Sequence, residues 1–278
     1  MHIPKNIILK VLYDDIGLCD LTSFSLDLER YSGKVSFYPK SACVICGVEE
    51  IKVIADELNL ECEIYKKSGD RVEAGEQLAT FKGDGASLHQ GWKMSQVLLE
   101  SMSAVATMTA NMLKIAKGQN PNIDLLTTRK NIPSAKELQL KAIMSGGAMP
   151  HRMGLYDSVL IFAEHTVFLG GGIEEAITLA KAKNPEKKIA IEVDTPELAH
   201  RAASAGADIL QCEKFTPEAL NNLNFEIKSI YPDIKLSATG GVNLKNIAEY
   251  AGTGVDMVVT SAPYYVKPLE IKCVFERV

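Results

Sequence analysis

The segment IDLLTTRKNIP, residues 123–133, joins a short apolar run to two adjacent cations, Arg129 and Lys130. Other apolar runs in the C-terminal half also end in polar or small residues. Those ends read FAEH (162–165), EVD (192–194), QCEK (211–214), ATGG (238–241) and TSA (260–262). Because ligands of parallel β/α folds bind at the carboxyl ends of the strands, we expect these residues to surround one pocket.

The residue types sort into two groups with different chemistry. Cations suit phosphate, diphosphate or carboxylate groups, and arginine can bind them through two hydrogen bonds. Acids suit Mg²⁺, ribose hydroxyls or a developing positive charge. The cationic group is Arg129, Lys130, His151 and Arg152, and the acidic group is Glu192, Asp194 and Glu213. Together they predict a site for a phosphorylated sugar with a diphosphate leaving group, whose oxocarbenium-like ribose the carboxylates would stabilise.

A glycine pair adds a further anion site. Thr239-Gly240-Gly241 comes before a helix that we expect to begin at Asn243. Free backbone N–H groups and a positive helix end favour phosphate there. A glycine pair alone is more often a simple turn, and the Arg129–Lys130 pair alone is more often a solvated loop. The prediction therefore depends on the combination.

The elements that must position these residues alternate regularly. Six apolar runs predict strands at 123–127, 157–162, 188–193, 207–212, 234–238 and 256–260. Amphipathic segments predict helices at 134–144, 173–183, 195–206, 216–230 and 243–254. Thr195-Pro196-Glu197 and Thr216-Pro217-Glu218 are typical helix starts. Six β/α units predict an α/β fold with a parallel sheet, either closed as a barrel or open and doubly wound.

The N-terminal part has a different pattern. Residues 1–110 contain short β-like runs, and 61–70 with 77–85 predicts an antiparallel pair whose turn signals are Gly69-Asp70 and Gly83-Asp84-Gly85. A long helix follows, to about Gly118. We expect domains at 1–110 and 111–264, with a C-terminal strand (265–278) that returns to the first domain.

Composition limits the possible functions. The chain has 278 residues, is 46% hydrophobic, and carries a net charge of −5 with a pI near 5.6. This acidity argues against a general nucleic-acid or acidic-membrane surface. No signal peptide or membrane span is evident, so we expect a cytoplasmic protein. Cys43 and Cys46 have CxxC spacing but lack partners for a closed zinc site, and we interpret them as reduced thiols.

Residues 127–165 (TTRKNIPSAKELQLKAIMSGGAMPHRMGLYDSVLIFAEH) resemble the signature of the type II phosphoribosyltransferases, of which quinolinate phosphoribosyltransferase is the best-known member. Similar segments are DDIGLCDLTS (14–23), GDRVEAGEQLATFKGDG (69–85), SMSAVAT (101–107), GADILQCEKFTPE (206–218) and ATGGVNLKNIAEYAGTGVD (238–256). The resemblance covers nearly the whole chain. HRMGLYDSVLIFAEH, CEKFTPE and VTSAPYY are most similar to the ModD subgroup, pyrophosphorylases encoded beside molybdenum-transport genes.

The resemblance implies an α/β-sandwich first domain and an open-faced α/β barrel of about six parallel strands, like a TIM barrel. It also implies a homodimer in which the first domain of one subunit helps to cover the barrel of the other. The reaction implied is transfer of a phosphoribosyl group from 5-phosphoribosyl 1-diphosphate to a nitrogen heterocycle, with Mg²⁺ accompanying the donor.

Residue by residue, the resemblance assigns catalytic roles to Glu192, Glu213 and Lys130. The substrate-binding positions that it implies are Lys93, Thr128, Arg129, Lys130, Lys136, His151, Arg152, Thr239, Gly240, Gly241, Thr260, Ser261 and Ala262.

The departures from the family pattern concern the acceptor. The quinolinate enzymes have Lys-Asp-Asn-His where this chain has Phe162-Ala163-Glu164-His165. Lys93 and Lys136 stand at positions where those enzymes have arginine, and Glu213 at the position of an aspartate. The charge is reduced where two adjacent carboxylates must be bound, which weakens quinolinate as the acceptor. Two alternatives remain open: an authentic quinolinate phosphoribosyltransferase of NAD biosynthesis, and a non-catalytic anion or nucleotide binder linked to molybdenum transport.

Overall fold

The computed structural model describes residues 1–278, which divide into two compact units. The first unit comprises Met1–Ala110, Asn131–Gly147 and Pro263–Val278, and the second comprises Asn111–Lys130 and Ala148–Ala262. The sequence placed residues 131–147 in the barrel domain, whereas their contacts place them in the first unit. Helix α4 (Gly85–Gln119) is continuous across the boundary.

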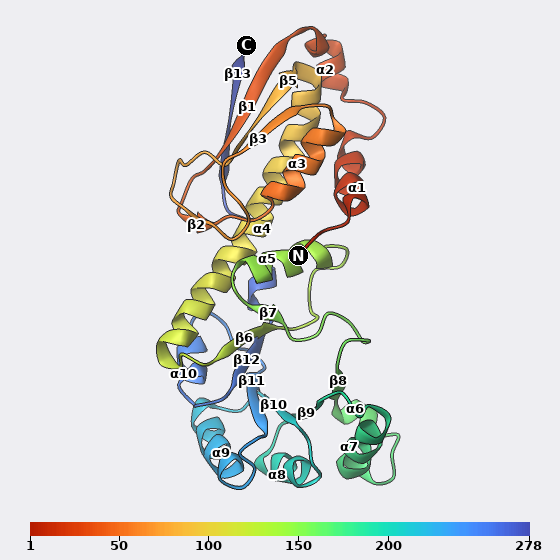
Figure 1. Ribbon diagram of the computed structural model, residues 1–278, viewed down its shortest axis with the longest axis vertical. Helices are drawn as coiled ribbons and strands as arrows, with labels where there is room; N and C mark the ends of the chain where they lie inside the picture. Colours follow the sequence, from red (N-terminus) through yellow and green to blue (C-terminus); the bar gives the residue numbers. More distant parts are fainter. The chain divides into compact units, whose positions relative to one another are not determined.

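The first unit is built on a four-stranded sheet of order β13-β1-β5-β3 (Figure 1). Its strands are Ile271–Arg277, Ser32–Pro39, Ala79–Asp84 and Glu61–Ile64, and each neighbouring pair is antiparallel. The predicted pairing of the segment at 61–70 with that at 77–85 is thus found as β3 and β5. Gly83 and Asp84 continue β5 and do not form a turn. The C-terminal strand β13 pairs with β1 of this same unit.

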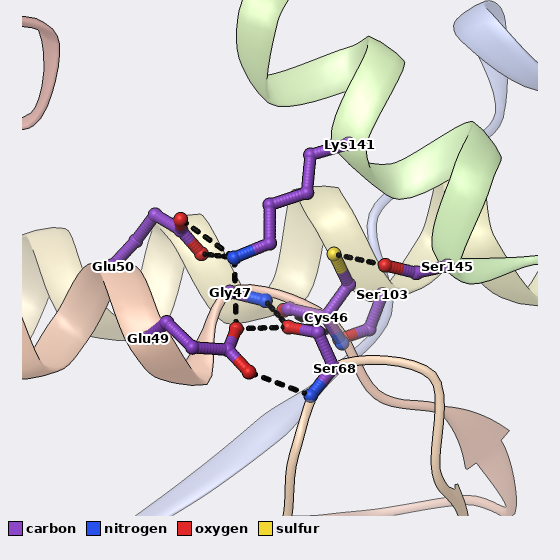
Figure 2. A network of polar contacts seen from close by, with 8 residues as sticks. All are labelled: Cys46, Gly47, Glu49, Glu50, Ser68, Ser103, Lys141 and Ser145. Carbon is purple, nitrogen blue, oxygen red and sulfur yellow. Dashed lines mark hydrogen bonds and ion pairs between the residues drawn. The ribbon is translucent and has the colours of Figure 1, made fainter. Parts of the chain in front are cut away.

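Helices and a two-stranded sheet complete the first unit. The helices are α1 (Lys5–Ile16), α2 (Leu21–Ser25), the 3-10 helices η1 (Leu28–Arg30) and η2 (Ala262–Tyr265, which begins one residue before the boundary), α3 (Val48–Glu57) and α5 (Lys136–Ser145). Strands β2 (Cys43–Val44) and β4 (Arg71–Val72) form a two-stranded antiparallel sheet, although α3 and β3 lie between them in the chain. A partly buried polar network links α3, α5 and the loop at Ser68 (Figure 2), in which Lys141 of α5 contacts Glu49 and Glu50 of α3.

The second unit contains a seven-stranded sheet in which every neighbouring pair is parallel. Its order is β7-β6-β12-β11-β10-β9-β8. The strands, in that order, are Met149–Pro150, Asp124–Thr127, Met257–Thr260, Lys235–Thr239, Ile209–Glu213, Ile189–Val193 and Val159–Ile161. β7 and β8 are edge strands that do not pair with each other, so the barrel is open. The prediction of an open-faced α/β barrel is confirmed, and the two-residue β7 is additional to the six predicted strands.

The helices of the second unit follow the predicted alternation. They are α6 (Ala163–Thr166), α7 (Gly172–Lys183), α8 (Pro196–Ser204), α9 (Pro217–Ile230) and α10 (Ile247–Ala251). The hydroxyls of Thr195 and Thr216 accept hydrogen bonds from the backbone N–H groups of Leu198 and Ala219, each at 3.2 Å. These caps and the prolines that follow them start α8 and α9 where the sequence indicated. No helix of either unit has both the length and the apolar character that crossing a membrane requires.

Candidate active site

A cavity of about 490 Å³ lies at the carboxyl ends of the barrel strands, entirely within the second unit. Eight of the predicted site residues line it: Thr128, Arg129, Lys130, His151, Arg152, Glu192, Glu213 and Thr239. The structure therefore brings cations from the ends of β6 and β7 together with acids from the ends of β9 and β10. The other lining residues are Leu160, Phe162, Glu164, His165, Gln211 and Val259.

Backbone hydrogen bonds hold the cationic side in place. The N–H of Thr128 donates to the carbonyl of Thr260 (3.1 Å), and the N–H of His151 donates to the carbonyl of Thr127 (2.8 Å). The N–H of Lys130 donates to the Thr128 hydroxyl (3.1 Å). The Thr-Arg-Lys run therefore leaves the sheet in a tight turn fixed by its own threonine.

Arg152 is the most enclosed cation, with 7% of its surface exposed. Its guanidinium carbon lies 5.9 Å from the centre of the Phe162 ring. Burial lowers the pKa of Arg152 and the neighbouring Arg129 lowers it further, while Asp157 opposes both. Neither arginine forms an ion pair with a carboxylate, and Asp157 only partly offsets the effects that disfavour the charge of Arg152.

His151 lies in surroundings that disfavour a positive charge. Burial lowers the pKa of this imidazole from its ordinary value of 6.5, the charge of Arg152 lowers it further, and Asp157 acts in the opposite direction. The cavity therefore favours the neutral form of this imidazole.

The acidic side comes from two adjacent parallel strands. Glu192 of β9 and Gln211 of β10 are partners in register, and Glu213 lies two residues further along β10 on the same face. Burial raises the pKa of Glu192, and the charges of Glu213 and Glu164 raise it further. A hydrogen bond from Gln211 Nε2 to Glu192 Oε2 (2.8 Å) acts to lower the pKa of Glu192.

The glycine pair follows β11 in a conformation that only glycine adopts easily. Gly240 and Gly241 have φ values of +85° and +81°. A Cβ at Gly240 would lie 2.7 Å from Glu213 Oε1, whereas a Cβ at Gly241 would face open space. The side-chain amides of Asn243 and Asn246 donate to the Gly241 carbonyl at 2.9 and 3.2 Å.

The helix expected at Asn243 begins four residues later. The backbone N–H of Asn243 donates to Asn246 Oδ1 (2.8 Å), and a turn occupies 244–246 before α10 starts at Ile247. Asparagine side chains that bond to nearby backbone favour turns over helix at this position. The glycine pair is therefore followed by a turn and not directly by a helix.

The remaining predicted residues lie outside the cavity lining. Thr260 Oγ1 donates to the Val242 carbonyl (2.6 Å) and accepts from the Ala262 N–H (3.0 Å), so this hydroxyl holds the loop that follows Gly241. Lys93 and Lys136 belong to the first unit, where Lys93 Nζ donates to Gln96 Oε1 at 2.9 Å. The others outside the lining are Asp194, Gly240, Gly241, Ser261 and Ala262.

Three polar lining residues were not among the predicted site residues: Glu164, His165 and Gln211. Glu164 and His165 follow β8, where His165 stacks on Phe162 with ring centres 5.7 Å apart and its Nδ1 accepts from the Phe162 N–H (2.9 Å). Gln211 could have been found from the sequence, because the two-residue period of a strand places it on the same face as Glu213.

Comparison with known proteins finds similarity to one family over nearly the whole chain. The family described as "Quinolinate phosphoribosyl transferase, C-terminal domain" matches residues 105–274, and the corresponding N-terminal domain matches 20–103. The chain is 35% identical to the protein named "Putative pyrophosphorylase ModD" of Pasteurella multocida, over 100% of this chain and 99% of that protein.

Two further relatives carry a different name. The chain is 31% identical to the protein named "Probable nicotinate-nucleotide pyrophosphorylase" of Methanothermobacter thermautotrophicus, over 91% of each. The solved nicotinate-nucleotide pyrophosphorylase of Francisella tularensis has the same fold, with a TM-score of 0.91 at 24% identity over 99% of this chain and 98% of that chain. The chain thus belongs to the quinolinate phosphoribosyl transferase family of type II phosphoribosyltransferases and is a ModD-like member of it.

Proposed function

We propose that the protein transfers a phosphoribosyl group from 5-phosphoribosyl 1-diphosphate to a nitrogen-heterocycle acceptor and releases diphosphate. The C1–O bond to diphosphate breaks with its electron pair leaving on the diphosphate, and the acceptor nitrogen forms the new bond to C1. Family membership supports this reaction class, and the cavity supports the assignment of roles.

The observation that carries the proposal is the separation of charge in the cavity. Arg129 and Arg152 lie close enough for one to lower the pKa of the other, and neither is paired with a carboxylate. Arg129 is exposed, but the burial of Arg152 beside a second cation is costly unless an anion binds there. Glu192 and Glu213 come from strands that also line the cavity, so an anionic leaving group and a developing cation each meet the opposite charge.

In this proposal Arg129, Lys130 and Arg152 bind the anionic groups of the substrates, with Lys130 also next to the reacting centre. Glu192 and Glu213 orient the ribose hydroxyls and stabilise positive charge at C1. Thr128, Thr239 and the Gly240–Gly241 turn contact phosphate, and His151 contributes a neutral hydrogen-bonding imidazole. Roles for Lys93, Lys136 and residues 260–262 in substrate binding are part of the same proposal.

Mg²⁺ enters in this proposal as the counter-ion of the donor diphosphate. The chain has no group of three or more His, Cys, Asp or Glu side chains placed to hold a metal ion. We further propose a homodimer whose neighbouring subunit completes the site. A cytoplasmic location also belongs to the proposal and suits the six cysteines, all of which are unpaired thiols.

Isothermal calorimetry with 5-phosphoribosyl 1-diphosphate, with and without Mg²⁺, tests the proposal. We expect binding by the wild-type protein and affinity lower by roughly 10- to 100-fold in Arg152→Ala, the value of a charge-assisted hydrogen bond. Arg201→Ala is the matched control, because Arg201 is an exposed arginine that pairs with Glu174 outside the cavity. No heat at about millimolar donor, or equal affinities for wild type and Arg152→Ala, would overturn it.

An authentic quinolinate phosphoribosyltransferase is the second candidate, supported by the relatives named nicotinate-nucleotide pyrophosphorylase. Phe162 argues against it, because the aromatic ring occupies a place in the cavity where a cation would hold a second carboxylate. Wild type and Phe162→Lys should be assayed with quinolinate for nicotinate mononucleotide and CO₂. Turnover that appears or increases only in Phe162→Lys supports a ModD-like acceptor, and efficient turnover by wild type supports the second candidate.

A further inference from the structure

The side chain of Gln211 forms a defined contact in the floor of the cavity. Its Nε2 lies 2.8 Å from Glu192 Oε2, and the two residues are partners in register on β10 and β9. Gln211 is 5% exposed, so its amide cannot be satisfied by bulk water alone. Only the NH₂ group of a glutamine can face a carboxylate oxygen as a donor, which fixes the orientation of the amide.

Glu192 needs such a partner because its surroundings disfavour its charge. Its side chain lies on the cavity face of β9, opposite the buried side chains of Ile191 and Val193. Burial raises its pKa most, Glu213 and Glu164 raise it further, and Lys130 lowers it slightly. The other charged or titratable side chains that line the cavity are Arg129, His151, Arg152 and His165.

The hydrogen bond from Gln211 is therefore the main local interaction that favours the carboxylate form of Glu192. It also engages only one carboxylate oxygen, Oε2. The second oxygen, Oε1, is left for a ligand in the cavity that both residues line.

We infer that Gln211 is a positioning residue whose amide anchors one oxygen of Glu192, so that the ionised carboxylate presents its other oxygen to the ribose. The inference rests on the proposed function for the identity of the ligand, but the contact between Gln211 and Glu192 can be tested without it. A side chain of equal length without a donor should leave Glu192 in place but harder to ionise.

Two substitutions at Gln211 separate the donor from the packing. Gln211→Met keeps the length of the side chain and removes the amide. Gln211→Glu keeps the shape and places a second acid against Glu192, so that the two carboxyl groups titrate as a coupled pair. The matched control is Gln96→Met, because Gln96 also donates its Nε2 to a carboxylate, that of Glu100 (3.1 Å), in the first unit.

The measurement is a pH titration by NMR of protein labelled with ¹³C at the glutamate carboxyl carbons, in which the Glu192 signal is assigned by its loss in Glu192→Gln. We expect the titration midpoint of Glu192 to rise by about 1 pH unit in Gln211→Met and by more in Gln211→Glu. It should be unchanged in Gln96→Met. An unchanged midpoint in Gln211→Met would overturn the inference, and if that variant does not fold, Gln211→Leu, which also lacks the donor and adds no charge, decides by the same criterion.

Donor binding provides the second readout. At a pH between the wild-type and variant midpoints, affinity for 5-phosphoribosyl 1-diphosphate should fall several-fold in Gln211→Met and recover as the pH is raised, which a loss of packing alone would not produce. If no variant or wild type binds the donor, the proposed function fails, while the NMR titration still decides whether Gln211 positions Glu192.

Discussion

At the scale of single residues, the cavity contains charged side chains whose charge is disfavoured by their surroundings. Arg152 is nearly buried and has an aromatic ring and another arginine as its neighbours. Burial disfavours the charge of Glu192, and the amide of Gln211 acts in the opposite direction. Phosphate groups of a ligand would supply the negative charge that Arg152 lacks, and ribose hydroxyls could donate hydrogen bonds to Glu192, so binding energy is available at both places.

The two glycines of the 240–241 turn should respond differently to the same substitution. Gly241→Ala introduces only the strain of a positive φ, about 1–2 kcal/mol in unfolding free energy. Gly240→Ala adds a clash with Glu213 Oε1, so we expect a larger loss of stability and displacement of that carboxylate. Urea unfolding and donor calorimetry on both variants test this, and equal losses in both would contradict the role of Gly240 as the position of close approach.

Two buried hydroxyls provide a second test at this scale. Ser237 Oγ is buried without a hydrogen-bond partner, whereas Thr260 Oγ1 has both a donor and an acceptor partner. We expect Ser237→Ala to keep or raise the unfolding free energy, by up to about 1 kcal/mol, since an unpaired polar group is removed. Thr260→Val should lower it by about 1–3 kcal/mol because two backbone groups lose their partner. Urea unfolding measures both changes, and equal destabilisation would show that Ser237 has a partner in solution.

At the scale of elements, the first unit relies on a buried ion pair between two helices. Lys141 Nζ on α5 lies 2.7 Å from both carboxylate oxygens of Glu50 and 2.8 Å from Glu49 Oε2, both on α3 (Figure 2). The side chains of Lys141 and Glu50 are 8% and 5% exposed. Residues 131–147 are joined to the first unit in part through this contact.

Removing one partner of this buried pair should lower the unfolding free energy far more than removing one partner of an exposed pair. Lys141→Met leaves a buried, uncompensated Glu50, and we expect a loss of about 3–5 kcal/mol in unfolding free energy. The double variant Lys141→Met with Glu50→Leu should recover most of it. Lys52→Met is the control. Lys52 lies on α3, the helix of Glu50, and forms an exposed pair with Asp56 that is worth less than about 1 kcal/mol. A similar cost for Lys141→Met and Lys52→Met in urea unfolding would contradict the buried pair.

Strands and helices could be predicted where the run of apolar residues is long enough to show a strand or helix periodicity. All six predicted barrel strands are present, because each is an apolar run and five of them come before an amphipathic helix. β7 was missed because Met149–Pro150 is too short to form a pattern. The start of α10 was placed too early because the asparagines at 243 and 246 bond to the turn, which propensity alone does not reveal.

At the scale of the whole molecule, the sequence indicated that the carboxyl ends of the barrel strands surround one cavity. It did not indicate which neighbours each side chain has there. The parallel sheet brings eight of the predicted residues to one cavity, as the topology of β/α units requires. The lowered pKa of His151 could not be predicted, because it arises from burial and from Arg152 beside it. The places of Lys93 and Lys136 relative to the cavity depend on how units and subunits assemble, so their roles stay predictions.

The acid stability of the protein should depend on Glu49. Burial raises the pKa of this carboxyl, but hydrogen bonds from Lys141 and Ser68 outweigh it and bring the pKa from 4.5 to about 2. A group whose pKa is lower in the folded state stabilises above its unfolded value and loses that contribution as the pH falls. The window is therefore pH 4.5 to about 2. Because Glu49 is half exposed, we expect only about 1 kcal/mol after solvent screening.

Urea unfolding of wild type and Glu49→Gln between pH 7 and pH 2 measures this contribution. The variant should be less stable than wild type at pH 7, and the difference should disappear as the pH falls through the window, because protonated Glu49 and glutamine are then equivalent. Ser68→Ala removes the hydroxyl that donates to Glu49 but keeps the backbone N–H that also donates to it, and should give an intermediate slope. A difference between wild type and Glu49→Gln that stays constant across the window would show that Glu49 has the same pKa in the folded and unfolded chain, and that Lys141 is neutralised by Glu50 alone.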